Sequence, residues 1–172
     1  MFGTGDGTYG GVFGAFPYAF RASESRLFRS YVVVGGLVAA LATVLFAGSV
    51  VTILANTFRT TGGTFTFSRA FVVVVALAIV GPILAPVLLV ARRHRRGGSG
   101  VAYDRALAAG GFGFLLSIYV ALVISAPPGA REEPPALIAP VVEVLYDLPQ
   151  IAGLVPLLVG VAVMYGLHRV YR

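Results

Sequence analysis

Four arginines surround one histidine in the segment ARRHRR, residues 91–96. Arg92, Arg93, Arg95 and Arg96 could bind the phosphate of a nucleic acid or of a lipid headgroup, since guanidinium groups form paired hydrogen bonds with phosphate oxygens. Nucleic-acid recognition would need more basic residues, an aromatic platform or a recognised fold around them. The neighbouring sequence offers none of these, so we expect no nucleic-acid partner. We expect the cluster to contact anionic headgroups and to orient the chain.

The acidic pair Glu143 and Asp147 is the second candidate for chemistry. Four residues apart on a helix, the two carboxylates could share a cation or act as an acid/base pair, but only the distant acids at 132–133 could join them. A solvated helix face is therefore the expected role of this external pair. His94 and His168 lie beside arginines at the edges of apolar blocks, whereas a haem ligand would lie deeper in a helix. The chain also lacks cysteine. We expect no catalytic site, no metal and no cofactor.

Long apolar blocks must position these groups. Of 172 residues, 58% are hydrophobic and 12% are charged, and the mean hydropathy is +0.89; a soluble domain carries about a quarter charged residues. Four blocks lack charge, and each is long enough for an α-helix to cross a hydrocarbon layer of about 30 Å. We therefore predict an all-α membrane protein, a bundle of four transmembrane helices in a single domain over residues 1–172. The predicted helices cover about 29–55, 70–91, 105–126 and 150–168.

Small residues at a spacing of four predict where these helices pack. In lipid, such a stripe lets two backbones approach closely. One stripe lies on the first span and one on the third, so these two helices could pair, or each stripe could contact whichever helix lies beside it. Pro82 and Pro86 predict a kink in the second span, which could be structural or could serve gating. The stripes comprise Gly35, Ala39, Thr43 and Ala47, and then Ala109, Gly113, Ser117 and Ala121.

The segments outside the spans each have their own pattern. Residues 1–22 are rich in glycine and aromatic residues, which predicts a flexible tail, and Ser23 before Glu24 is typical of a helix start. Residues 57–68 alternate apolar with polar types around Gly62–Gly63, which predicts a short external β-hairpin, with a flexible loop as the alternative. Within 126–150, apolar residues at helical spacing follow a proline-rich turn and predict a short amphipathic helix at the membrane interface.

The arginines also predict an orientation. With four spans, the N-terminal segment, the loop around residue 95 and the C-terminus share one side, which carries ten of the thirteen arginines. By the positive-inside rule that side faces the cytoplasm. We therefore expect a multi-pass protein of the cell's plasma membrane with both termini in the cytoplasm.

Three stretches, FPYAFRASESRLFRSYVVVGG, GPILAPVLLVARRHRR and APVVEVLYDLPQIAGLVP, resemble a family of small multi-pass membrane proteins from halophilic archaea. The use of arginine to the exclusion of lysine fits that source. The resemblance implies a location and a fold class, but no activity and no functional residues.

The leading functional expectation is a non-enzymatic accessory or assembly component of a membrane complex. Its partners would be lipids with anionic headgroups and either a second copy or other membrane subunits. The alternative is a small oligomeric transporter or channel gated at the Pro82/Pro86 kink. A membrane enzyme comes third, because it would require Glu143, Asp147 or His168 to be essential.

Overall fold

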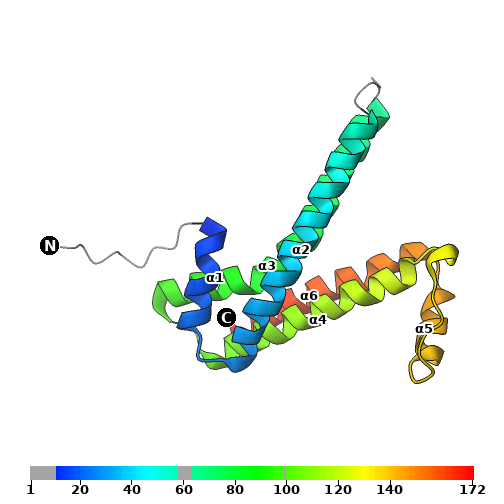
Figure 1. The fold of residues 1–172 in the computed structure, drawn as a ribbon. Coiled ribbons are helices and arrows are strands. Elements are labelled where there is room, and N and C mark those ends of the chain that lie inside the picture. Colours follow the sequence, from blue (N-terminus) through cyan, green and yellow to red (C-terminus); the bar gives the residue numbers. More distant parts are fainter. Residues whose placement is uncertain (1–10, 58–62, 99) are drawn as a thin grey trace.

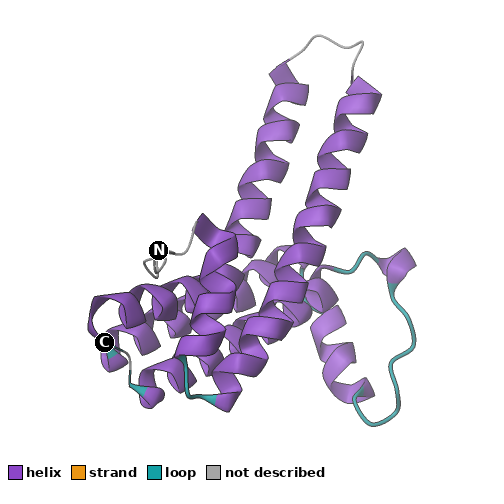
Figure 2. Ribbon diagram, turned by 60° about the vertical axis from the view of Figure 1, so that its left-hand side comes forward, coloured by secondary structure: helices purple, strands orange, loops and turns teal. Residues whose placement is uncertain are grey.

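The computed structural model describes residues 11–57, 63–98 and 100–172, and all regular elements within those ranges are helices (Figure 2). These ranges contain six α-helices and two short 3-10 helices. They are α1 (Gly11–Ala22), α2 (Arg26–Thr57), α3 (Gly63–Gly97), α4 (Val101–Ser125), η1 (Pro128–Ala130), α5 (Ala139–Tyr146), η2 (Gln150–Gly153) and α6 (Leu154–Tyr171).

Within the described ranges, four helices are long and apolar enough to cross a membrane, as the prediction of an all-α protein with four spans requires. These candidate spans are Arg26–Asn56, Phe67–Gly97, Val101–Ser125 and Gln150–Tyr171. The first two exceed the predicted lengths at both ends. With 32 residues in α2 and a rise of 1.5 Å per residue, this helix is about 48 Å long. A hydrocarbon layer is about 30 Å thick, so α2 must tilt or extend beyond it.

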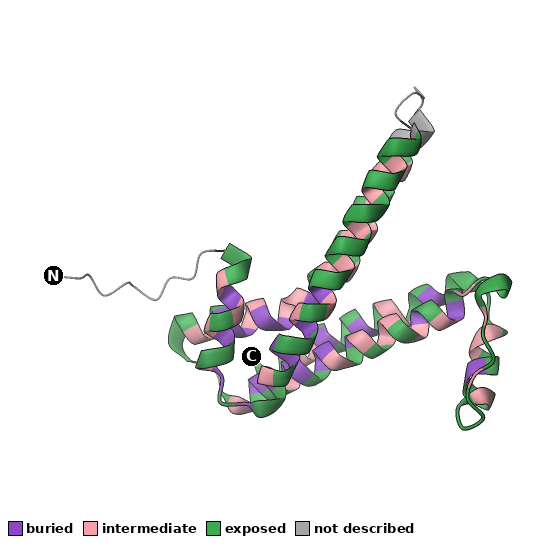
Figure 3. Ribbon diagram, in the orientation of Figure 1, coloured by how far each residue is buried: buried purple, intermediate pink, exposed green. Residues whose placement is uncertain are grey.

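Two helical hairpins diverge from a common base (Figure 1). α2 pairs with α3 in one hairpin and α4 pairs with α6 in the other. The start of α2, the end of α3 and the start of α4 meet at the base, where α1 covers them. Buried side chains gather there, while the far half of the α2–α3 hairpin is mostly exposed (Figure 3). The main core cluster comprises Ala15, Ala19, Phe28, Tyr31, Val32, Val87, Val90, Ala91, Tyr103, Leu107 and Ala108.

The predicted tail over residues 1–22 is wrong from Gly11 onward, because Gly11–Ala22 forms α1; residues 1–10 lie outside the described part. The helix forms because Ala15 and Ala19, four residues apart, are fully buried against the base. This burial outweighs the low helix propensity of glycine. The residue that caps the next helix also differs from the predicted one. Ser25, rather than Ser23, caps α2, since its Oγ accepts the Phe28 N–H at 3.2 Å.

The predicted β-hairpin over residues 57–68 is also wrong. Thr57 ends α2, and α3 already begins at Gly63; residues 58–62 lie outside the described part. A physical reason favours the helix. A helix satisfies its backbone groups within one segment, whereas a two-stranded hairpin leaves its outer N–H and C=O groups unpaired next to lipid. The alternation of threonine and phenylalanine therefore did not decide the structure.

Pro82 and Pro86, the residues at which a kink was predicted, both lie inside α3. This helix changes direction along its length in Figure 1. Each proline removes one backbone donor from the helix. Near this point the hydroxyl of Tyr31 in α2 donates to the carbonyl of Ile83 at 2.7 Å. Tyr31 is fully buried, and Phe112 of α4 packs edge-on against its ring. One tyrosine thus joins α2, α3 and α4 at the kink.

The short helix predicted between the third and fourth spans is α5, and it lies across the far ends of α4 and α6 (Figure 1). Val142 is its one buried residue. Arg131 lies 5.0 Å from the centre of the Tyr146 ring, which joins α5 to the proline-rich loop before it.

Candidate functional site

Ten arginines gather where the helices meet, at what we call the arginine-rich end. The up-and-down course of the four long helices brings together the ends that carry these residues. Because α3 and α6 end here, their C-terminal carbonyl groups also attract cations. The set comprises Arg21, Arg26, Arg29, Arg92, Arg93, Arg95, Arg96, Arg105, Arg169 and Arg172.

A buried carboxylate organises the centre of this end. Asp104, in the first turn of α4, is only 1% exposed. Ser23, between α1 and α2, donates its hydroxyl to Asp104 Oδ2 at 2.6 Å. His94 in the last turn of α3 places Nε2 3.1 Å from the same oxygen. One carboxylate therefore links the α1–α2 connection to α3 and α4.

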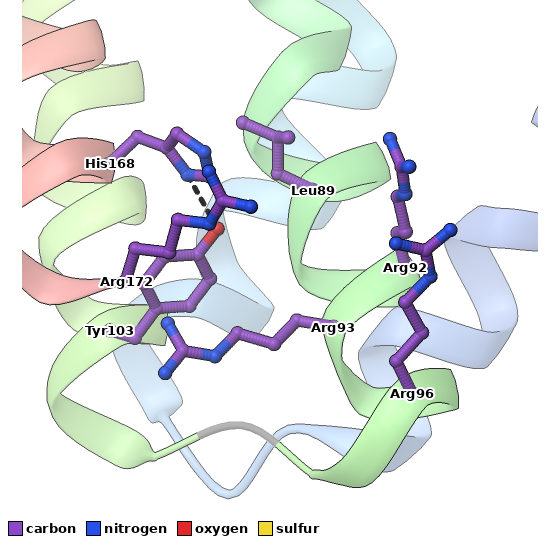
Figure 4. A pocket seen from close by; sticks show the side chains of 7 residues that line it. All are labelled: Leu89, Arg92, Arg93, Arg96, Tyr103, His168 and Arg172. Carbon is purple, nitrogen blue, oxygen red and sulfur yellow. Dashed lines mark hydrogen bonds between the residues drawn. The ribbon is translucent and has the colours of Figure 1, made fainter.

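Beside this network is a cavity of about 410 Å³, which we call the arginine pocket. α3 contributes three arginines and a leucine, α4 a tyrosine, and the end of the chain a histidine and an arginine. In Figure 4, Arg92 and Arg96 lie along α3 on one side, and Tyr103, His168 and Arg172 lie on the other. The lining residues are Leu89, Arg92, Arg93, Arg96, Tyr103, His168 and Arg172.

Arg93 and Tyr103 form a fixed wall of the pocket. The Arg93 guanidinium carbon lies 4.1 Å from the centre of the Tyr103 ring, and Nη1 donates to the Tyr171 carbonyl at 2.9 Å. The Tyr103 hydroxyl in turn lies 2.9 Å from His168 Nδ1. These contacts tie α3, α4 and α6 together and reduce the side-chain freedom that a bound anion would otherwise have to restrict.

The structure refines the predicted arginine cluster. Arg92, Arg93 and Arg96 line the pocket, whereas Arg95 is exposed and lies outside its lining. Tyr103, His168 and Arg172 were missed as partners of the cluster. His168 and Arg172 are far from it in sequence, and Tyr103 lies close in sequence but on the next helix, α4. Asp104 was missed because the third span was predicted to begin at residue 105. The available signal was an acid ten residues after a histidine, beyond the glycine-rich segment 97–100.

The acidic pair Glu143 and Asp147 is not assembled into a site. Glu143 and Asp147 are both exposed, and the Asp147 N–H donates to the Glu143 carbonyl at the end of α5. Among the residues that the structure describes, no three histidine, cysteine or acidic side chains come close enough to hold a metal ion.

The small-residue stripes divide between covered and open positions. On α2, Gly35 and Ala39 are buried, while Thr43 and Ala47 are exposed. On α4, Ala121 is buried and Ser117 is half-buried, while Ala109 and Gly113 are exposed. The most extensive contact of α4 is with α6.

Glycines of α6 and of the turn before it produce this close approach. A Cβ on Gly160 would lie 2.6 Å from Ser117 Oγ, and a Cβ on Gly153 would lie 2.8 Å from the Ala121 carbonyl oxygen. α2 also meets α4. The ring of Tyr31 occupies the space that a Cβ on Gly111 would take, and Ala39 of the α2 stripe lies in one buried cluster with Phe114 of α4.

Comparison with known proteins gives a family match without an activity. A family model described as "Domain of unknown function (DUF8056)" matches residues 4–172. No curated protein and no solved structure matches the chain. A function must therefore be inferred from the geometry of the chain itself.

Proposed function

This chain belongs to the DUF8056 family, and we propose that it is a non-enzymatic accessory or assembly component of a membrane complex. We infer that the α2–α3 hairpin receives the partner, either a second copy or another membrane subunit. The arginine-rich end would lie at the cytoplasmic face of the cell membrane, with both termini on that side, and α5 would lie in the opposite interface.

The observation that carries this proposal is that other parts of the described chain bury few side chains of the α2–α3 hairpin, least of all those of α2. In the apolar window of each span, α2 has the lowest share of buried residues, 6%, against 17% in α3, 17% in the span that contains α6, and 39% in α4. The hairpin also diverges from α4 and α6 (Figure 1), so its far half has no helical neighbour within the described chain.

Lipid alone could cover apolar side chains, since hydrocarbon tails are as apolar as leucine. Lipid does not account for a stripe of small residues, because the advantage of small side chains is that they let the backbone of another helix approach closely. Thr43 and Ala47 belong to the predicted packing stripe, yet they are exposed, and a Cβ on Gly48 would have no neighbour within 4 Å. An uncovered small-residue face on a projecting hairpin favours a helical partner.

The cytoplasmic placement rests on the charge distribution. Ten of thirteen arginines lie at one end, and short loops with excess arginine are retained in the cytoplasm. The gating alternative at Pro82 and Pro86 is less well supported, because the groove beside Pro82 is lined by apolar side chains rather than by a polar path.

Native mass spectrometry of the protein released from its own membrane, without prior delipidation, tests the proposal. We expect assemblies heavier than the 17.9 kDa chain. Ala47→Phe should reduce them, because a large ring would block close helix contact. Leu122→Phe, at an exposed position of α4, is the control and should leave them unchanged. A lone monomer in the wild type, or equal effects of both substitutions, would sink the proposal.

A further inference from the structure

The arginine pocket and an apolar groove lie on the same three helices. The groove has a volume of about 630 Å³ and is formed by α3, α4 and α6; Val75, Ile79, Pro82, Phe114, Leu157 and Tyr165 are among its lining residues. On α6, Tyr165 lines the groove and His168 lines the pocket. Three residues along a helix correspond to about 4.5 Å and nearly one turn, so the two cavities adjoin on one helix face.

The same register holds on α3. Pro82 lines the groove and Leu89 lines the pocket, and seven residues make almost two full turns. Both cavities therefore follow one line along the molecule. The cavity at the arginine-rich end is polar, and the groove toward the middle of the spans is apolar. A lipid molecule has the same arrangement, with a polar headgroup followed by an apolar chain.

The polar part of this line carries a concentrated positive charge. Arg92, Arg93, Arg96 and Arg172 line it, and no acidic side chain of the described residues does. The nearby carboxylate of Asp104 is buried and bonded to Ser23 and His94. Four guanidinium groups around one cavity repel each other unless an anion lies between them, and arginine matches the geometry of phosphate oxygens.

We propose that this face of α3, α4 and α6 binds one anionic phospholipid molecule. The phosphate of its headgroup lies in the arginine pocket, and an acyl or alkyl chain lies in the apolar groove. Four arginines favour a headgroup with more than one negative charge over a singly charged one. Tyr103 and His168 bear hydroxyl and ring nitrogen groups that can hydrogen-bond to headgroup oxygens.

The lipid is favoured over free phosphate because two adjoining cavities match its two halves. A basic pocket between spanning helices at a membrane face is also a recognised headgroup site. The inference does not rest on the proposed function. Both involve α3, but the partner contact is argued from the exposed small-residue face of α2, and the lipid site from the two cavities that α3, α4 and α6 line.

The test is a binding titration of the purified, delipidated full chain in detergent, read by native mass spectrometry. The probes are phosphatidic acid, cardiolipin, phosphatidylcholine with matched chains, and inorganic phosphate. We expect a single saturable site with affinities in the order cardiolipin, phosphatidic acid, phosphatidylcholine, and with inorganic phosphate weaker than either anionic lipid. Phosphatidylcholine binding as tightly as cardiolipin would overturn the anionic part of the proposal. Inorganic phosphate binding as tightly as phosphatidic acid would overturn the apolar part.

Variants locate the headgroup site. An arginine near a charged lipid surface contributes about fivefold in affinity, so Arg92→Gln together with Arg96→Gln should weaken cardiolipin binding by about 25-fold. Arg105→Gln, at an exposed arginine of the same end that lies outside the lining, removes one charge, as Arg172→Gln does; it is the control and should change binding by less than about twofold. Equal losses in the control and the pocket variant would overturn the site. Arg172→Gln gives an independent reading, with an expected loss of about fivefold.

The groove has its own variant. Ala162→Phe places a ring among the groove residues, so it should weaken both anionic lipids while leaving inorganic phosphate unchanged. Val33→Phe, at an exposed position of α2, is its control and should not affect binding. Lipid binding insensitive to Ala162→Phe would contradict the placement of the chain.

Discussion

Gly160 offers the sharpest test of how the second helical hairpin is built. A Cβ at this position would lie 2.6 Å from Ser117 Oγ and 3.0 Å from Phe114 Cδ2, whereas ordinary contact begins near 3.4 Å. Gly160→Ala must therefore move α6 from α4 by about 0.4–0.8 Å, or rotate Ser117 away from the Phe114 carbonyl that its hydroxyl bonds at 2.7 Å. Overpacking of this kind costs about 1–3 kcal/mol.

Gly166→Ala is the matched control on the same helix, because a Cβ there meets nothing within 4 Å. Both substitutions gain about 1 kcal/mol of helix propensity, so the difference between them isolates the packing cost. We expect the free energy of unfolding of Gly160→Ala to be lower by about 1–3 kcal/mol. The measurement is unfolding of the purified protein with increasing dodecyl sulfate, followed by circular dichroism because the chain has no tryptophan.

A double substitution identifies the contact. If Ser117 is the main obstacle, Ser117→Gly should clearly reduce the cost of Gly160→Ala when compared with Ser117→Gly alone, since the two effects are coupled; the 3.0 Å approach to Phe114 Cδ2 remains. Equal stabilities for Gly160→Ala and Gly166→Ala, or an unchanged cost in the Ser117→Gly background, would refute the described packing.

Three further outcomes are expected. Tyr31→Phe should lower the free energy of unfolding by about 1–2 kcal/mol, because the Ile83 carbonyl loses its donor at the α3 kink; thermal melts in detergent measure this, and an unchanged melt would contradict it. Asp104→Ala should cost about 1–3 kcal/mol or more, because Ser23 and His94 lose a buried acceptor, and Asp104→Asn should cost less; equal costs would count against the network. In the cysteine-free chain, Ala102→Cys should react with an impermeant maleimide only after lysis of intact cells, and Ala130→Cys should react before lysis. The reverse pattern would invert the proposed topology.

The four-span architecture could be predicted because it depends on a one-dimensional property. A charged residue near a bilayer centre costs about 2.5–3.5 kcal/mol, so the positions of Arg29, Arg92, Arg105 and Arg169 already delimit the apolar helices. Local patterns predicted less well. The Thr/Phe alternation around residue 65 indicated strands, yet helical hydrogen bonding from Gly63 prevailed, and glycines near residue 11 indicated a tail, yet burial of Ala15 and Ala19 made a helix.

The site was only half predictable for a related reason. Arg92, Arg93 and Arg96 are adjacent in sequence, so their shared location was evident. Tyr103 and His168 are 65 residues apart, and only the pairing of α4 with α6 brings them together. The spacing of small residues on α4 indicated that another helix packs closely against it, but not which helix. The partner is the α6 segment, whose glycines at positions 153 and 160 are seven residues apart rather than four and so did not stand out.

Position-specific photocross-linking in native membranes tests the central claim most directly, which is that the α2–α3 hairpin is a protein interface. A benzophenone amino acid is placed at Leu45 of α2 or at Leu122 of α4, which are 63% and 65% exposed. We predict a protein adduct from Leu45 and lipid adducts alone from Leu122. Lipid adducts alone from both positions, or equal protein adducts from both, would contradict it.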